Sequence, residues 1–462
     1  MSADLWQGVP GEGRPLGEFS RRGLVGVIGR LAVPVVLANL SQTLMGLVDT
    51  LMVGRLGPAP LAAVGLATLL FSALAMSLKH ADVAAQTITA RRIGEGRHGE
   101  VGAVLATAIT VTLALGLVFM TVGLAWPGYL MRLVTTDVEV RDLGIEYLRY
   151  RYAGILPLLV FFMVKAVTDG IGWTRIGMGV GIGMNLANIL LNWILIFGKL
   201  GAPAMGVGGA ALASTLSAGL AAVVILGFVL RPAVRRRFRI IHRGNFQVRL
   251  IGPFVRLGWP PALQTLGNLV ALLVFFLILG RISTLAVATG NVVLRMAAVS
   301  FMPGVGVGVA LQTAVSQSLG RRDVRGARRA TWIGVGLSVA FMGSLGLVFL
   351  LAPGFLMRLF SGSEDLVAAG IPILRLMGLV QVIDAVGLTL SGALRGAGAT
   401  RPVMIVDILT GFLMLPPLAY LFGVVLGGGL MGAWLALMVW WSLFAVGMAF
   451  LYSRLKWHEV RV

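Results

Sequence analysis

Residues 169–178 read DGIGWTRIGM, and residues 395–404, 226 positions later, read RGAGATRPVM. The same offset superposes other parts of the chain without gaps. Matching pairs include Gly54-Arg55 with Gly280-Arg281, Gln86-Thr87 with Gln312-Thr313, and LMRL at residues 130–133 with LMRL at residues 356–359. Agreement at one offset in separate regions indicates two consecutive repeats.

The composition places these repeats in a membrane. Hydrophobic residues make up 58% of the 462 residues and charged residues 12%, against about 25% charged in a soluble domain. A helix crosses the hydrocarbon core with about 20 apolar residues, and runs of this length are too apolar for the alternating strands of a barrel. We predict an all-α polytopic membrane protein with twelve transmembrane helices, at 28–53, 61–84, 101–126, 143–166, 176–197, 206–230, 254–279, 285–311, 330–352, 368–392, 402–424 and 427–452.

The net charge of +20 would suggest nucleic acid in a soluble protein. Here the basic residues fall mostly on one side of the predicted spans, in the N-terminal segment, in the loops at 91–97, 231–256 and 321–329, and after residue 453. By the positive-inside rule, both termini are cytoplasmic. We therefore expect a multi-pass protein of the inner (plasma) membrane whose basic loops face anionic lipid, and no nucleic-acid partner.

The repeats predict how the chain is divided and what it does. Each repeat has an even number of spans and keeps its basic loops on the same side, so the repeats are parallel, which suggests a mid-membrane cavity between two rocking bundles. Transport by alternating access is the function that this architecture favours. The predicted parts are a cytoplasmic segment (1–25), an N-lobe (26–230), a basic cytoplasmic linker (231–253), a C-lobe (254–453) and a cytoplasmic tail (454–462).

Polar side chains inside the spans of the first repeat are candidate functional residues. The first span carries Asn39, Gln42 and Asp49, and the fifth carries Asn185, Asn188 and Asn192. An ionised Asp near the bilayer centre costs roughly 2.5–3.5 kcal/mol on insertion scales, so it should face a cavity and have a use.

The three Asn residues are spaced by three and four and share one helical face. A carboxylate with amide oxygens could hold Na⁺ at Asp49, Asn188 and Asn192. A proton is the alternative occupant, because burial disfavours an ionised carboxylate. Alternatively, the amides only join helices by hydrogen bonds, at about 0.6 kcal/mol each.

The second repeat offers a different set. Gln264 and Asn268 lie in the seventh span and Asp384 in the tenth, and Asp384 has no acidic counterpart at residue 158. Asp407, about one turn into the eleventh span, is interpreted as facing Arg401 near the cytoplasmic interface. Arg295 in the eighth span should face the cavity or a carboxylate.

Lys79, His80 and Asp82 lie together in the second span. Charges three apart on one helical face can pair, so Lys79 and Asp82 can neutralise each other. His80 ionises near neutral pH and could relay protons, although a packed, hydrogen-bonded histidine explains it as well. The role of this group stays open.

Motifs of enzymes and nucleotide-driven pumps are absent from the sequence. There is no HExxH pair and no GxxxxGK[ST] loop, and GVGVGV at residues 304–309 lies inside a span. The chain has no Cys, which excludes a disulfide framework or a thiol metal site. We expect no enzyme and no cofactor, and an ion gradient as the energy source.

The motifs resemble those of the multidrug and toxic compound extrusion family, in its NorM-like and DinF-like bacterial branch. The resemblance covers about residues 25–452. Its carriers are LVDTLMVGRLG in the first span, NILLNWILIFG in the fifth, GVGGAALAST opening the sixth, QTAVSQSLGRRD after the eighth and GALRGAGATRPVM after the tenth.

The resemblance implies a V-shaped, two-lobe exporter that exchanges H⁺ or Na⁺ for organic, often cationic compounds. Asp49 matches the N-lobe acid of the family, Asn188 and Asn192 the polar pair around it, and Ser214 a small hydroxyl position. Asp384 matches the C-lobe acid of the NorM-like branch. That branch has a Glu in the seventh span where this chain offers only Gln264 or Asn268, which favours Asp49 as the coupling residue.

The expected partners are small-molecule drugs or toxins and the lipid bilayer, and we expect a monomer. Asn39, Gln42, Asn185, Gln264, Asn268 and Arg295 are candidates for lining the substrate cavity. Two other functions compete with drug export. A flippase for a lipid-linked precursor would share the architecture but need several deep Arg residues, and a membrane-embedded lipid-modifying enzyme would need an acidic metal-binding cluster.

Overall fold

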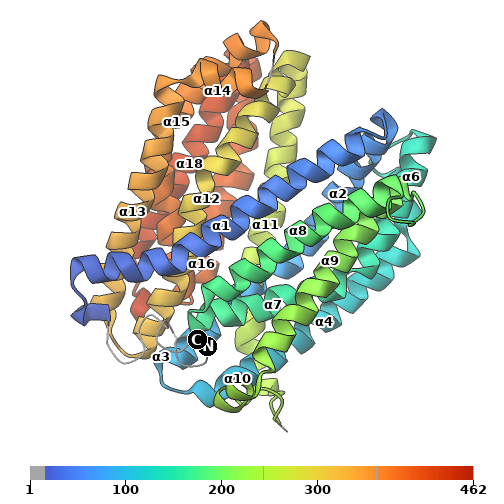
Figure 1. The fold of residues 1–462 in the computed structure, drawn as a ribbon. Coiled ribbons are helices and arrows are strands. Elements are labelled where there is room, and N and C mark those ends of the chain that lie inside the picture. The colour runs from blue at the N-terminus through green and yellow to red at the C-terminus, as the bar shows by residue number, and fades with distance from the viewer. Residues whose placement is uncertain (1–15, 243, 361, 461–462) are drawn as a thin grey trace. The chain divides into compact units, whose positions relative to one another are not determined.

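The structure, a computed structural model, describes residues 16–242, 244–360 and 362–460 (Figure 1). These ranges contain helices and connecting turns and no β-strand. Eleven helical segments are long and apolar enough to cross a membrane, and a bent pair, α6 (Val138–Ala153) and α7 (Ile155–Ile171), makes up to twelve. The predicted all-α polytopic class is therefore confirmed, with the fourth predicted span realised as the bent pair.

The bend between α6 and α7 is 46° and has a local cause. Pro157 has no N–H to donate to the carbonyl of Ala153, and its ring crowds the preceding turn. Gly154 lies at the break, and a Cβ atom there would come within 2.3 Å of the Thr215 hydroxyl. That hydroxyl donates to the carbonyl of Tyr150 at 2.8 Å, which fixes the bend against α9.

The chain folds into two compact units. The first, the 37–262 unit, holds the second half of α1 and the start of α11. Its other helices are α2 (Pro58–Lys79), α3 (Asp82–Gly94), η2 (His98–Glu100), α4 (Val101–Ala125), α5 (Pro127–Arg132), α6, α7, α8 (Thr174–Phe197), α9 (Gly206–Val229) and α10 (Pro232–Arg237).

The second, the 263–462 unit, also includes the chain up to Val36, so α1 (Arg21–Gly54) and α11 (Val248–Ile282) each contribute to both units. Its other elements are η1 (Leu16–Glu18), α12 (Thr284–Gly320), α13 (Val324–Leu351), α14 (Pro353–Phe360), α15 (Glu364–Gly396), α16 (Thr400–Asp407), η3 (Ile408–Met414), α17 (Leu415–Tyr420), η4 (Leu421–Val425), α18 (Gly429–Arg454) and η5 (Trp457–Glu459).

The sequence repeat recurs in the element boundaries. α2 begins at Pro58 and α12 at Thr284, and α8 begins at Thr174 and α16 at Thr400, each pair at the sequence offset of 226. The repeats differ in where their helices break. The second span of the first repeat breaks at His80 and Ala81 into α2 and α3, whereas α12 is continuous at the equivalent place. Lys79 therefore ends α2 and Asp82 begins α3, and the charge of Asp82 acts on Lys79 across the break.

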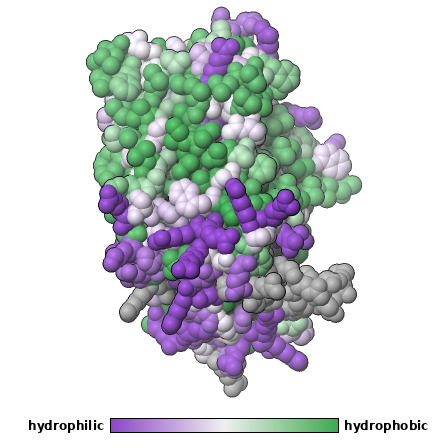
Figure 2. Space-filling model, turned by 90° about the vertical axis from the view of Figure 1, so that its left-hand side faces the viewer, coloured by the Kyte–Doolittle hydropathy of each residue, from purple (hydrophilic) through white to green (hydrophobic). Residues whose placement is uncertain are grey.

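The outer surface of the helices is apolar, as a bilayer requires. Leu186 on α8 is 63% exposed and Val223 on α9 is 67% exposed. Figure 2 shows hydrophobic residues over most of one face and hydrophilic residues gathered toward one end. Burying apolar side chains in lipid needs no protein partner, so the exposure is consistent with a membrane-spanning chain.

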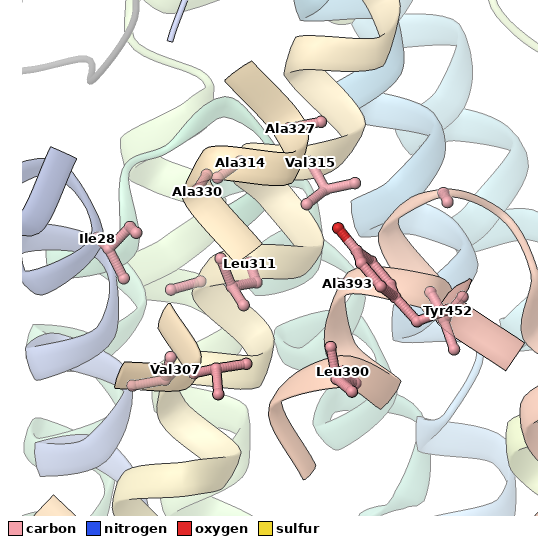
Figure 3. Close-up of a cluster of buried hydrophobic side chains, with 14 of the residues drawn as sticks. Ile28, Val307, Leu311, Ala314, Val315, Ala327, Ala330, Leu390, Ala393 and Tyr452 are labelled. Carbon is pink, nitrogen blue, oxygen red and sulfur yellow. The ribbon is translucent and has the colours of Figure 1, made fainter. Parts of the chain in front are cut away.

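A core cluster in which alanines alternate with larger aliphatic and aromatic side chains lies in the 263–462 unit (Figure 3). Ile28 of α1 packs with Leu311 and Ala314 of α12, Ala330 of α13 and Ala393 of α15 in one cluster. Small side chains allow helix backbones to approach closely. A Cβ atom on Gly392 of α15 would come within 2.3 Å of the carbonyl oxygen of Gly308 on α12.

The basic segment that joins the repeats is folded in part. It contains α10, and Phe238 after it is 1% exposed and makes an edge-to-face contact with Trp173. The carbonyl of Phe238 accepts a hydrogen bond from the N–H of Gly102 at 3.0 Å. This part of the segment is therefore packed within the 37–262 unit.

Candidate functional site

A polar network surrounds Asp49 inside the 37–262 unit. Asn192 of α8 donates from its Nδ2 to Asp49 Oδ1 at 2.5 Å, and the same Nδ2 lies 3.1 Å from one end of the Asn188 amide. Asn188 and Asn192 are 1% and 0% exposed, whereas Asp49 is half-buried. The carboxylate is thus held by a buried amide face but keeps access to its surroundings.

Ser214 of α9 completes this network. One end of the Asn188 amide lies 3.1 Å from Ser214 Oγ, which donates to the carbonyl of Ala210 at 3.1 Å. With its amide turned so that the oxygen faces Ser214, the Asn188 nitrogen donates to Asp49 Oδ1 at 2.9 Å. In that orientation the Asn188 oxygen accepts from the backbone N–H of Ser214 at 3.2 Å and its nitrogen donates to a carboxylate, which suits both ends of the amide. The structure brings together Asp49, Asn188, Asn192 and Ser214, as the sequence suggested.

The other polar candidates of the first repeat lie along the same helices. Asn185 donates to Ser41 Oγ at 2.8 Å and so joins α8 to α1. The Oδ1 atoms of Asn185 and Asn192 are buried without a hydrogen-bond partner in the described chain. Neither Asn39 nor Gln42 makes a side-chain hydrogen bond with the described residues, and both are partly exposed on α1.

The nearest positive charge that acts on Asp49 is Arg151 of α6. Its guanidinium lies over the ring of Phe71, 4.2 Å from the ring centroid, a cation–π contact. No ion pair involves Asp49 within the described ranges. Arg151 therefore acts on the carboxylate through space, without an ion pair.

A cavity of about 280 Å³ lies inside the 263–462 unit. Asp384 of α15 and Asp407 of α16 both line it, and they are 4% and 3% exposed. Their charges act on each other. The remaining lining residues include the polar Gln264, Thr265, Asn268, Gln312, Ser391 and Arg395 and the aromatic Phe301, Trp440, Trp441 and Phe444.

The structure gives Asp407 a different setting from the one that the sequence suggested. Its Oδ2 accepts from Asn268 Nδ2 at 2.8 Å, so the carboxylate faces the seventh span and the cavity. Arg395 donates to Gln264 Oε1 at 2.9 Å and supplies the positive charge near Asp407. Asp407 ends α16 at the start of the π-helical η3, and such distortions of a helix are frequent at functional sites.

Asp407 lies deeper in its span than the sequence suggested. It lies seven residues after the first residue of α16, about two turns in. The rule that an intramembrane carboxylate is functional by default would have identified it. Asn268, Gln264 and Asp384 are brought together as candidates, whereas Arg295 is exposed on α12 and lies outside both polar groups.

A third charged group lies buried in the 37–262 unit. Lys165 Nζ and Asp169 Oδ2 on α7 form an ion pair of 2.6 Å, and the charge of Asp82 acts on Lys165. Lys79 lies over the ring of Phe162, 4.9 Å from its centroid. His80 and Asp82 also have partners of their own.

The sequence repeat relates this charged group to the cavity of the other unit. Residues 79, 82, 165 and 169 correspond to Val305, Gly308, Ser391 and Arg395, and all four of these line the cavity. Equivalent positions are therefore filled with charged side chains in one repeat and border open space in the other.

Two repeats of membrane helices with buried carboxylates and amides inside them define a polytopic membrane transporter. The sequence profile of the MatE family matches residues 34–194 and 260–421, which cover both repeats. The chain therefore belongs to the MatE family. Family membership makes the protein a membrane transporter and not an enzyme.

Relatives with curated descriptions match most of the chain. It is 28% identical over 420 residues to the "Probable multidrug resistance protein NorM" of Thermotoga maritima, with 88% of each chain covered. It is 29% identical over 441 residues to the "Multidrug resistance protein NorM" of Burkholderia vietnamiensis, covering 93% of this chain and 92% of that relative. These matches confirm the resemblance to the NorM-like branch.

The fold is shared with solved structures. One is described as "Outward-facing conformation of a multidrug resistance MATE family transporter of the MOP superfamily", with a TM-score of 0.88, 24% identity, and coverage of 96% of this chain and 98% of that chain. Another is described as "Crystal structure of MATE in the straight conformation", with a TM-score of 0.86, 25% identity, and coverage of 95% and 97%.

Proposed function

We propose that this protein is a secondary active multidrug efflux antiporter that exchanges H⁺ or Na⁺ for organic, cationic or amphiphilic compounds by alternating access. The relatives described as multidrug resistance proteins support drug export. The observation that carries the ion coupling is the network around Asp49, a half-buried carboxylate in the last two turns of the apolar helix α1, bonded to a buried amide of α8.

The network suits a site that alternates between ion-bound and ion-free states. With the ion absent, the amide N–H groups of Asn192 and Asn188 stabilise the ionised carboxylate. A proton on Asp49 removes the negative charge, weakens the carboxyl oxygen as an acceptor for these donors, and adds an O–H donor. Na⁺ instead takes oxygen ligands, and Asn192 Oδ1, which has no partner among the described residues, would become a ligand after a turn of the amide. Either ion is cargo of the cycle and rearranges the contact between α1 and α8.

Coupling requires that the ion and the drug favour different conformations, since a ligand with equal affinity for both shifts nothing. We propose that ion binding at Asp49 from outside favours release of the drug, and that return of the ion to the cytoplasm restores drug binding. Asp384 and Asp407 support the same cycle in the 263–462 unit, because two carboxylates in one cavity favour a shared positive ion. The apolar and aromatic lining of that cavity suits flat organic cations.

Proteoliposomes test this proposal directly. Purified protein is reconstituted with an imposed pH gradient alone or an imposed Na⁺ gradient alone, and export of a fluorescent organic cation such as ethidium is followed. Drug movement driven by one gradient and lost in Asp49→Asn supports the antiport mechanism. Equal export with no gradient would contradict secondary transport, and full coupled export by Asp49→Asn would contradict the assignment of Asp49.

The proposal includes the cellular location, the membrane topology and the oligomeric state of the protein. The distribution of Lys and Arg between the loops supports an inner-membrane protein with both termini in the cytoplasm. We propose that it works as a monomer, since both candidate sites lie within single units of one chain.

A further inference from the structure

A groove of about 670 Å³ lies in the 263–462 unit between the start of α1 and the first half of α13. It belongs to neither polar group described above. Its lining residues are Arg21, Val25, Arg328, Arg329, Trp332, Ile333, Gly336 and Leu337.

The groove lining changes from basic to apolar along both helices, from the N-terminal end of each toward its C-terminal end. On α13, Arg328 and Arg329 are followed one turn later by Trp332 and a further turn later by Gly336 and Leu337. On α1, Arg21 is followed one turn later by Val25. One end of the groove is therefore cationic and the other apolar, with an indole between them.

The cationic end has guanidinium N–H donors that make no hydrogen bond with the described part of the chain. Arg329 is committed, because it donates to the carbonyls of Gly17 at 2.6 Å and Phe19 at 3.1 Å. Arg21 and Arg328 are exposed, and neither forms an ion pair or hydrogen bond with the described part of the chain. Asp323, the closest acid on α13, is occupied as the N-cap of the helix and accepts from Gly17 N–H at 2.8 Å.

The apolar end is open. A Cβ atom on Gly336 would meet nothing within 4 Å, and Trp332 is 58% exposed while its ring contacts Tyr452 edge to face. An exposed Trp beside arginines is typical of the membrane–water interface.

We propose that this groove binds an anionic phospholipid, with its phosphate on Arg21 and Arg328 and an acyl chain along Trp332 and Gly336. The charge sign, the order of polar and apolar lining and the position at the end of two membrane helices all fit such a lipid. Basic pockets between membrane helices at the cytoplasmic interface bind anionic headgroups, so placing the lipid in the inner leaflet rests on the topology proposed above.

Quenching of tryptophan fluorescence by brominated lipids tests the site. Full-length protein is reconstituted in vesicles of dibromo-phosphatidylglycerol or dibromo-phosphatidylcholine, and the signal of Trp332 is isolated as the difference between wild type and Trp332→Phe. We expect stronger quenching by the anionic lipid. The preference is the affinity for the anionic lipid divided by that for phosphatidylcholine. It should fall about tenfold in the Arg21→Gln/Arg328→Gln variant, because each interfacial cation contributes to anionic lipid binding.

Matched variants separate the groove from general surface charge. Arg325→Gln removes an exposed cation of α13 that does not line the groove and should leave the preference unchanged. Gly336→Leu should block the acyl chain, whereas Gly219→Leu on α9, also with open space at its Cβ, should not. Equal quenching by both lipids, or an unchanged preference in the double Arg variant, would overturn the proposal. Transport assays do not enter this test, so its failure is distinct from failure of the antiport mechanism.

Discussion

At the scale of single residues, the proposed ion coupling depends on a carboxylate inside the membrane that can change its charge. Asp49 is bonded to Asn192 and acted on by Arg151, but it forms no ion pair with any described residue. A carboxylate locked to an arginine would have a fixed charge. Asp49 instead has neutral amide partners that can adapt to an ion, which makes its substitution informative.

Asp49→Asn should abolish coupled export while leaving the fold intact, because the amide keeps the shape but not the charge. We expect the drug export rate to fall by at least about tenfold, the effect of about 1.4 kcal/mol on the transport barrier. The measurement is efflux from cells with matched protein levels. Asp142→Asn, which alters an acid that is 66% exposed, is the control and should transport normally.

Asp407→Asn should also impair export, since it removes one of the two carboxylates of the cavity. A role limited to packing predicts normal kinetics for this nearly isosteric change. We expect a several-fold higher concentration of the coupling ion at half-maximal export, because a single carboxylate attracts a cation less strongly. An unchanged ion dependence in Asp407→Asn, measured beside Asp384→Asn, would show that the cavity carries no coupling ion.

The pair of Lys165 and Asp169 should matter for stability. Lys165→Met removes the ion-pair partner of an acid whose side chain is 3% exposed, and breaking a buried pair costs about 3–5 kcal/mol. Thermal unfolding in detergent should occur at a clearly lower temperature, with recovery in Lys165→Met/Asp169→Leu. Arg141→Ala breaks an exposed pair and should change the unfolding temperature little. A single mutant as stable as wild type would contradict this account.

At the scale of elements, close helix crossings and helix breaks position the two sites. α12 and α15 cross where Gly308 and Gly392 touch, and both glycines line the cavity. The apolar runs of the sequence predicted the membrane spans, because the length and hydropathy of a run report its burial in lipid. The structure has eleven such helices, or up to twelve with the bent pair, within the described residues. The sequence did not predict the helix break at His80 and Ala81 or the π-helical η3, since such features depend on tertiary contacts of particular side chains.

Gly392→Ala should destabilise the protein although Ala is the better helix former. The new methyl group would come within 2.3 Å of a backbone oxygen, and backbone cannot move aside as a side chain can. We expect a loss of about 1–3 kcal/mol, as for overpacking in a core, seen as a lower unfolding temperature. Gly219→Ala, which meets nothing within 4 Å, should be neutral or slightly stabilising. Equal unfolding temperatures of the two variants would contradict the close backbone contact between α12 and α15.

At the scale of the whole molecule, the repeat and the charge distribution were readable from the sequence, and the candidate sites were readable in part. Asp49, Asn188 and Asn192 were found because spacing places amides on one face. The partnership of Asp384 with Asp407 was missed, because these acids lie on different helices at positions that the repeat does not relate. Pairings between helices are set by packing, which a sequence pattern does not encode.

The absence of Cys from the natural chain makes the predicted topology simple to test. A single Cys at Ser453, after the last span, should react with a membrane-impermeant maleimide in inside-out vesicles and not in intact cells. A single Cys at Ser363, between the ninth and tenth spans, should show the opposite pattern. Both positions are exposed. Labelling of position 453 in intact cells would reverse the assigned orientation.

The correspondence between the charged group of the first repeat and the cavity of the second has an evolutionary consequence. A duplication begins with two identical interiors, and here four equivalent positions carry ammonium and carboxylate groups in one copy and line a cavity in the other. The halves are therefore specialised and not interchangeable. A protein assembled from two first halves would carry Asp49 twice and neither Asp384 nor Asp407, and one assembled from two second halves would carry the acids of the cavity twice and no Asp49.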